Sequence, residues 1–236
     1  MRTFADLHLI HPGHAQGLSS MAERASILGY GLVGLTVRGR PEDPESLRRE
    51  FSERGIDVAL RVDLSPSSRQ ELLSLLGKYR ASFEIVSVNC ANKAICDVAS
   101  RDGRVDLIFF GSGPIGSRVR LPKEASSALE VNIRELIAPR GGLDLAQALR
   151  KVKWDLEVAL ENGMRVVASS GADGPALMRA PREIASLLKF LGMSPEGALA
   201  SVSTTPASLV RSNRMKLRGE IVCEGVRALA GDRWDG

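Results

Sequence analysis

The strongest constraint on the fold is the regular alternation of short apolar segments with amphipathic segments along this 236-residue chain. Apolar runs of strand length recur, and the intervening segments carry apolar residues at helical spacing. The first of these helices is predicted to end at Gly29 and is marked by Leu18, Met21, Ala25 and Leu28. Successive strands that are each joined by a helix run parallel, because a parallel return needs a crossover connection. The pattern therefore predicts an α/β protein with a parallel sheet.

We predict seven strands, at residues 3–9, 32–37, 56–62, 84–88, 105–110, 128–133 and 165–170. The longest helix is predicted to begin after Asp144, a suitable N-cap residue, and to end at Asn162 and Gly163. Three helices with proline near the first turn follow without a clear eighth strand: 181–191, 195–202 and 206–213. Such units close most easily into a barrel of the triosephosphate isomerase (TIM) type. A doubly wound open sheet is less favoured, since no Gly-x-Gly-x-x-Gly turn follows the first strand.

We expect a single α/β barrel domain over residues 1–213 and a helical tail over 214–236 that packs on it. The apolar side of that tail would consist of Ile221, Val222, Val226 and Leu229. No uncharged apolar run reaches the roughly 18 residues of a membrane span, and residues 1–6 contain no signal-peptide core, so we expect a cytoplasmic protein with no membrane contact. The three cysteines have no Cys-x-x-Cys spacing and suggest neither a disulfide framework nor a zinc ribbon.

Arginine carries most of the positive charge, with 25 arginines against 7 lysines and a net charge of +4. The guanidinium group binds phosphate through two donors and stacks on bases, so an arginine-rich surface suits RNA. Codon usage in a GC-rich genome would produce the same composition. Composition alone leaves both explanations open, because it does not show whether the arginines share one face.

Functional residues of a TIM-type barrel lie at the carboxyl ends of its strands. Alternation along the first strand predicts that Asp6 and His8 point together into this barrel mouth, as the first ligands of metal-dependent hydrolases do. A working hydrolytic site needs further ligands, yet the other histidines, His11 and His14, both lie in the first loop. We therefore expect no metal site here, and regard Asp6 and His8 as vestigial candidates only. We identify no catalytic residue.

Besides an RNA-binding protein and a metal-dependent hydrolase, two weaker features leave a third hypothesis, an enzyme that acts on phosphorylated metabolites. Ser169, Ser170 and Gly171 follow the seventh strand, and loop amides of this kind can hold a phosphate at a helix N-terminus. Asp63 beside Arg61 is a candidate base, although this pair is equally well a structural salt bridge.

Five segments in a specific order and spacing extend over nearly the whole chain: FADLH (4–8), LEVNIREL (129–136), SSGA (169–172), MRAPREI (178–184) and TPASLV (205–210). Together they resemble the protein component 3 family of archaeal ribonuclease P, the counterpart of the eukaryotic p30 subunit. The resemblance implies a distorted barrel related to polymerase-and-histidinol-phosphatase-like hydrolases. It also implies a non-catalytic subunit of an endoribonuclease holoenzyme.

In this family the RNA subunit, using Mg²⁺, removes the 5′ leader from precursor tRNA, and a chain of this kind supports it without a cofactor of its own. The implied partners are the ribonuclease P RNA, precursor tRNA, protein component 2 and the other protein subunits. The alternative is a metal-dependent hydrolase of the same superfamily. As RNA contacts we predict strand-end and loop residues first and long-helix residues second: Arg38, Arg40, Arg118, Arg120, Arg134, Ser170, Arg179 and Arg182, then Lys153 and Arg150.

Overall fold

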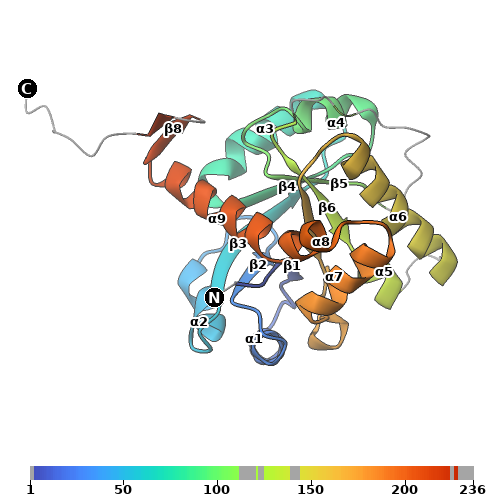
Figure 1. Ribbon diagram of the computed structural model, residues 1–236. Coiled ribbons are helices and arrows are strands. Elements are labelled where there is room, and N and C mark those ends of the chain that lie inside the picture. The colour runs from blue at the N-terminus through green and yellow to red at the C-terminus, as the bar shows by residue number, and fades with distance from the viewer. Residues whose placement is uncertain (1–2, 112–120, 122–124, 139–143, 224–225, 228–236) are drawn as a thin grey trace, which may run out of the picture.

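The computed structural model describes residues 3–111, 121, 125–138, 144–223 and 226–227. Seven parallel strands form one sheet in sequence order: β1 (Ala5–Ile10), β2 (Leu32–Thr36), β3 (Asp57–Leu64), β4 (Ile85–Asn89), β5 (Leu107–Phe109), β6 (Ala128–Asn132) and β7 (Val166–Ser169). The last strand returns to the first, because the Ile10 N–H donates to the Ala172 carbonyl at 2.7 Å and Leu9 forms a parallel bridge with Ala172. The predicted TIM-like barrel is confirmed, and it is almost closed (Figure 1).

Helices surround this barrel in the predicted alternation with the strands (Figure 1). Those that connect strands are α1 (Ala15–Ile27), α2 (Pro44–Ser52), α3 (Arg69–Tyr79), α4 (Lys93–Ala99), α5 (Arg134–Ile137) and α6 (Leu145–Glu161), with a 3-10 turn at Arg80–Ser82. Asp144 caps α6 as predicted, since its carboxylate accepts the Gln147 N–H at 2.7 Å. A second 3-10 turn (Pro175–Leu177) and three helices follow β7: α7 (Pro181–Phe190), α8 (Pro195–Ser201) and α9 (Thr204–Leu217).

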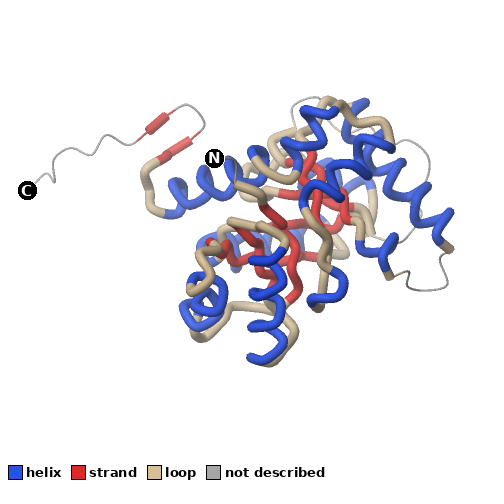
Figure 2. Tube along the Cα trace, turned by 60° about the horizontal axis from the view of Figure 1, so that its bottom comes forward, coloured by secondary structure: helices blue, strands red, loops and turns tan. Residues whose placement is uncertain are grey.

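The C-terminal tail differs from the expectation. Helix α9 continues to Leu217, so the expected boundary at residue 213 falls inside it. The helical tail expected over 214–236 is wrong for the described residues 221–223 and 226–227, where β8 (Ile221–Cys223) and β9 (Val226–Arg227) form an antiparallel hairpin. In both views this hairpin extends from the end of α9 away from the barrel (Figures 1 and 2). Residues 224–225 and 228–236 lie outside the described part of the chain.

The barrel interior is apolar at the amino ends of the strands and polar at their carboxyl ends. The apolar layer contains one or two small or medium side chains from each strand and is covered by α9: Ala5, Leu7, Leu32, Ala59, Ile85, Leu107, Ala128 and Val167, with Leu209 and Val210 of α9. Two residues further along the strands, the inward positions carry Arg61, Ser87, Glu130 and Ser169, each at most 1% exposed. The closed apolar end leaves the carboxyl end as the opening of the barrel.

A β-bulge in β1 changes which of its side chains enter the barrel. The register of β1 against β2 shifts between Asp6 and Leu9. Leu7 belongs to the inner apolar layer, and His8 contacts Asp63 inside the mouth. Asp6 instead accepts the backbone N–H of Ser170 at the seam between β1 and β7. The expectation that strand alternation brings Asp6 and His8 together into the mouth is therefore wrong.

No helix in the described ranges is both long enough and apolar enough to cross a membrane.

The bulge depends on Gly34 of β2, because a Cβ at this position would lie 2.4 Å from the Leu7 carbonyl oxygen. We expect Gly34→Ala to lower the free energy of unfolding by about 1–3 kcal/mol, the usual cost of overpacking against a backbone that must move. Urea unfolding followed by circular dichroism measures this change.

Gly77→Ala is the matched control, since Gly77 lies on α3 with no atom within 4 Å of an added Cβ. We expect that variant to gain about 0.5–1 kcal/mol from helix propensity. Equal stability of Gly34→Ala and the wild type would show that the bulge accommodates a side chain.

Candidate functional site

Four charged side chains meet at the carboxyl ends of β1, β3 and β6, and we name them the mouth cluster: His8, Arg61, Asp63 and Glu130. Each strand turns its inward residue toward the same space near the barrel axis. Arg61 and Glu130 are almost completely buried, at 0% and 1% exposure, whereas the Asp63 side chain retains 24%. The cluster therefore closes the barrel below its opening.

Arg61 lies at the centre of the mouth cluster and joins three strands. Its Nη1 and Nη2 atoms donate to the two oxygens of Glu130, each at 2.6 Å. Its Nε donates to Asp63 Oδ1 at 2.6 Å, and Nη1 also donates to the Leu7 carbonyl at 2.9 Å. The planar fork of arginine suits this bidentate geometry, which lysine would not reproduce.

His8 lies between the two carboxylates of the cluster. Its Nε2 is 3.2 Å from Asp63 Oδ2 and its Nδ1 is 3.4 Å from Glu130 Oε1. The Asn132 amide nitrogen lies 3.0 Å from His8 Nδ1, and the Arg134 N–H donates to the Asn132 oxygen at 2.8 Å. The imidazole is thus held on both sides by polar groups.

The ionisation of these groups follows from their mutual contacts. Burial and the Arg61 guanidinium oppose protonation of His8, but Glu130 and Asp63 outweigh them and raise the pKa of His8 to about 9. Burial alone would raise the pKa of both carboxyl groups, yet the Arg61 and His8 charges lower the pKa of Glu130 and of Asp63 below their ordinary values. At neutral pH two positive and two negative charges balance within the cluster.

This balance decides what the mouth can do chemically. In a metal-dependent hydrolase, a divalent cation would occupy the centre of such a set of carboxylates and imidazole. Here the Arg61 guanidinium occupies that centre and donates to both carboxylates. Among the residues that the structure describes, no group of three or more histidine, cysteine, aspartate or glutamate side chains is arranged to hold a metal ion.

The polar groups of residues 169–172, predicted as a weak phosphate site, form hydrogen bonds within the protein. The Ser169 hydroxyl donates to Glu130 at 2.5 Å, the Ser170 N–H donates to Asp6 at 3.2 Å, and the Ala172 N–H donates to the Ser170 hydroxyl at 3.3 Å. Ser169 and Ser170 are 0% exposed. These three donors are therefore engaged within the protein, and Ser170 has no surface with which to contact RNA.

The predicted RNA contacts separate into several places. Arg38 and Arg40 are exposed in the loop after β2, on the side of the mouth formed by β1 to β3. Arg134 follows β6 on the opposite side, where its guanidinium forms two hydrogen bonds of 2.9 and 2.8 Å with Asp173. Arg150 and Lys153 are exposed on α6, and Lys153 forms the expected i,i+4 pair with Glu157 at 3.7 Å.

Arg179 and Arg182 do not lie at the mouth. The Tyr30 hydroxyl donates to the Arg179 carbonyl at 2.7 Å, and the Arg182 guanidinium lies 5.5 Å from the ring centroid of Phe4, which precedes β1. Both contacts place the start of α7 beside the amino ends of the first strands. Arg118 and Arg120 lie outside the described residues.

Glu130 is the one member of the mouth cluster that the sequence reasoning did not select. Asn132, two residues later, lies near the end of the predicted strand 128–133, and alternation puts Glu130 on the same inward side. A carboxylate in the middle of an otherwise apolar strand is the signal that identifies it, because such a charge is buried only with a partner.

Fold and site together define a class of protein: a seven-stranded (β/α) barrel whose mouth is closed by its own ion pairs. Residues 3–218 match the family described as RNase P subunit p30. The chain belongs to that family. It is 31% identical to ribonuclease P protein component 3 of Methanococcoides burtonii, over 95% of this chain and 93% of the relative. It is 26% identical to the protein of the same name from Methanothermobacter thermautotrophicus, over 96% and 95%.

Solved structures agree on the fold. A chain from the cryo-EM structure of archaeal ribonuclease P with mature tRNA matches with a TM-score of 0.74 and 17% identity, covering 97% of this chain and 99% of that one. An amidohydrolase matches with a TM-score of 0.53 and 14% identity, over 89% and 74%. At these identities the likeness concerns the barrel alone.

Removal of the Arg61 charge tests the structural role of the mouth cluster. We expect Arg61→Met to lower the free energy of unfolding by about 3–5 kcal/mol, because the buried Glu130 carboxylate and the part-buried Asp63 carboxylate lose their partner. Arg61→Lys, which keeps the charge without the fork, should lose less. The exposed ion pair between Lys153 and Glu157 provides the control. The free energy of unfolding of Lys153→Gln should stay within about 0.5 kcal/mol of the wild type. Urea unfolding measures all three, and a stable Arg61→Met protein would contradict the assigned role.

The raised pKa of His8 gives stability a defined pH dependence. Protonated His8 is favoured in the folded state, so its contribution is complete below the unfolded pKa of about 6.5 and is lost as pH rises through about 9. We expect the free energy of unfolding to fall by about 3 kcal/mol across this interval. His8→Gln should lack this part of the pH dependence. Subtracting the stability profile of this variant from that of the wild type removes the contributions of other groups that titrate in the same interval. Parallel profiles for the two proteins would refute the assignment.

Proposed function

We propose that this chain is a non-catalytic protein subunit of ribonuclease P that supports the catalytic RNA during removal of the 5′ leader from precursor tRNA. The observation that carries the proposal is the Arg61 guanidinium, which fills the centre of the mouth cluster and pairs with both carboxylates. Membership of the RNase P subunit p30 family supplies the assembly in which the chain would act. The barrel is then a scaffold that offers binding surface rather than catalytic groups.

The partners in this proposal are the ribonuclease P RNA, precursor tRNA, protein component 2 and the other protein subunits, in the cytoplasm. The chain holds no cofactor of its own, and Mg²⁺ serves the RNA subunit. A folded RNA and its docked substrate bring phosphates close together, and fixed guanidinium groups reduce that repulsion. Exposed arginines on this chain would thus replace part of the Mg²⁺ that the RNA otherwise requires.

The RNA contacts that we retain as part of this proposal are cations that the structure leaves exposed: Arg38, Arg40, Arg150, Lys153 and Arg182. Arg118 and Arg120 remain proposed contacts from the sequence alone. Arg134 and Arg179 rank lower, because their guanidinium groups already bind Asp173 and backbone carbonyls of the same segment. A part-buried group in short contacts gains less from phosphate, since it must give up those partners, whereas the 3.7 Å pair of Lys153 with Glu157 is exposed and weak.

Reconstitution tests the proposal. The RNA subunit with protein component 2 is assayed for cleavage of precursor tRNA across Mg²⁺ concentrations, with and without this chain. We expect the chain to lower the Mg²⁺ concentration needed for half-maximal cleavage and this effect to weaken as NaCl rises, because binding releases counterions from the RNA.

The chain alone should release no leader in Mg²⁺, Mn²⁺ or Zn²⁺. The double variant Arg150→Gln/Lys153→Gln should need more Mg²⁺ than the wild type, whereas Arg211→Gln, an exposed arginine on α9 that we do not propose as a contact, should behave like the wild type. An unchanged Mg²⁺ requirement with and without the chain, or cleavage by the chain alone, would overturn the proposal.

A further inference from the structure

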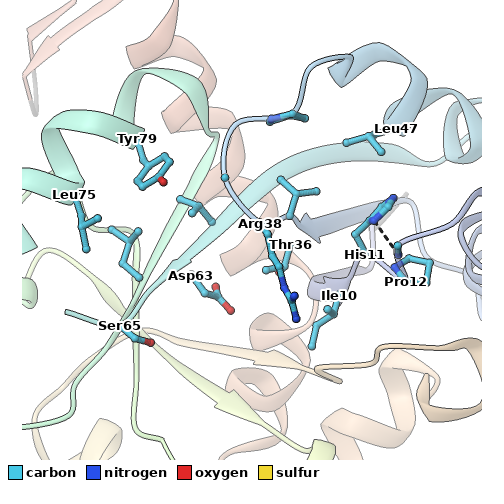
Figure 3. Close-up of a pocket in the computed structure, with 16 residues that line it drawn as sticks. Ile10, His11, Pro12, Thr36, Arg38, Leu47, Asp63, Ser65, Leu75 and Tyr79 are labelled. Carbon is cyan, nitrogen blue, oxygen red and sulfur yellow. Dashed lines mark hydrogen bonds between the residues drawn. The ribbon is translucent and has the colours of Figure 1, made fainter. Parts of the chain in front are cut away.

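A cavity of about 920 Å³ opens beside the mouth cluster, between the carboxyl ends of β1 to β3 and α3 (Figure 3). Its size lies in the range of small-molecule sites. Leu75 and the Tyr79 ring lie together on the α3 side of the cavity, Arg38 and Asp63 lie near its middle, and Leu47 lies apart on the α2 side (Figure 3). The cavity therefore combines an apolar side with charged groups near its middle.

The carboxylate at the floor of this cavity does not repel an anion. Asp63 Oδ1 accepts from Arg61 Nε at 2.6 Å, and Oδ2 lies 3.2 Å from His8 Nε2. Both of its oxygens therefore face positive groups on the barrel side. The charges of the mouth cluster cancel one another, so the field in the cavity is set by the residues around its rim.

The cavity lining carries the positive charge of Arg38. Arg38 is exposed, lines the cavity and forms no ion pair or hydrogen bond with any other described residue. Arg40 Nη2 donates to the Lys78 carbonyl at 3.2 Å, which joins the β2–α2 loop to the end of α3. The Lys78 ammonium lies 5.0 Å from the centroid of the Tyr79 ring. Arg40 and Lys78 thus place two further cations on the loop and the helix end that border the cavity, outside its lining.

Two neutral polar groups also line the cavity. His11 Nδ1 accepts the Gly13 N–H at 3.1 Å, so its proton resides on Nε2. Burial, together with the nearby His14, lowers the pKa of His11 and keeps it a neutral donor at physiological pH. The Thr36 hydroxyl oxygen is buried and has no hydrogen-bond partner among the described residues. The His11 Nε2–H can donate to a polar ligand that enters the cavity.

We propose that this cavity, the nucleotide pocket, binds one unpaired nucleotide of an RNA, with its phosphate at Arg38 and its base against Leu75 and Tyr79. Proteins recognise RNA mainly through unstacked bases placed on aromatic or apolar surfaces, with cations on the backbone. The inference rests on the proposed function, because it names where the RNA partner would insert an unpaired base.

The test measures binding of a fluorescently labelled short oligouridylate to the full chain by anisotropy. We expect Arg38→Gln to weaken binding about tenfold through the lost phosphate contact, and Tyr79→Leu to weaken it about tenfold through the lost ring. Tyr79→Phe keeps the ring and should bind like the wild type. Arg211→Gln, the exposed arginine on α9, is the matched charge control and should also bind like the wild type. Thermal melting verifies that each variant folds.

Competition separates the nucleotide from a simple anion. Uridine monophosphate should displace the labelled RNA at a lower concentration than inorganic phosphate does, because the base adds contacts. Equal competition would show an anion site only and overturn the inference. Wild-type affinity in Arg38→Gln and Tyr79→Leu, with RNA binding intact, would overturn the pocket and leave the proposed function standing. Absence of RNA binding by the wild type, with no Mg²⁺ effect in the reconstitution, would overturn both.

Discussion

The bidentate pair between Arg61 and Glu130 is the contact on which the carboxyl-end half of the barrel depends. It joins β3 to β6 through the barrel interior, and the additional bond to the Leu7 carbonyl brings in β1. These groups are almost fully removed from water, so each is stable only while the others are present. Three strands far apart in the sequence are thereby fixed at the end where other barrels bind substrates.

The same pair explains why the mouth contains several ionisable side chains but offers few of them to a ligand. An imidazole, two carboxylates and a guanidinium bond mainly to one another. Many arginines elsewhere are also occupied: Arg80 pairs with Asp106, and Arg214 pairs with Asp57 and Glu84. The number of arginines in the sequence is therefore larger than the number available to bind RNA. The proposed RNA binding depends on the exposed cations.

Much of the barrel was predictable from the sequence, because apolar strands separated by amphipathic helices permit few arrangements. The errors concern features that sequence patterns do not specify. The bulge in β1 reverses the expected side of Asp6, and it arises from the close approach of Gly34 to the Leu7 backbone. The tail was expected to be a helix, but a short segment with Ile221 and Val222 also suits a strand, and periodicity cannot separate the two over so few residues. Glu130 joins the site through partners that are remote in the chain, among them Arg61 at a separation of 69 residues and Ser169 at 39.

A barrel closed by an internal guanidinium differs from a metal-closed barrel in how it responds to its surroundings. When an ion completes a fold, the folded population follows the free concentration of that ion. In this chain Arg61 is covalently part of the polypeptide, so the occupancy of the central position is always complete. Newly made copies would reach the same folded state whether zinc and manganese are scarce or abundant, and assembly with RNA would begin from a scaffold of constant shape.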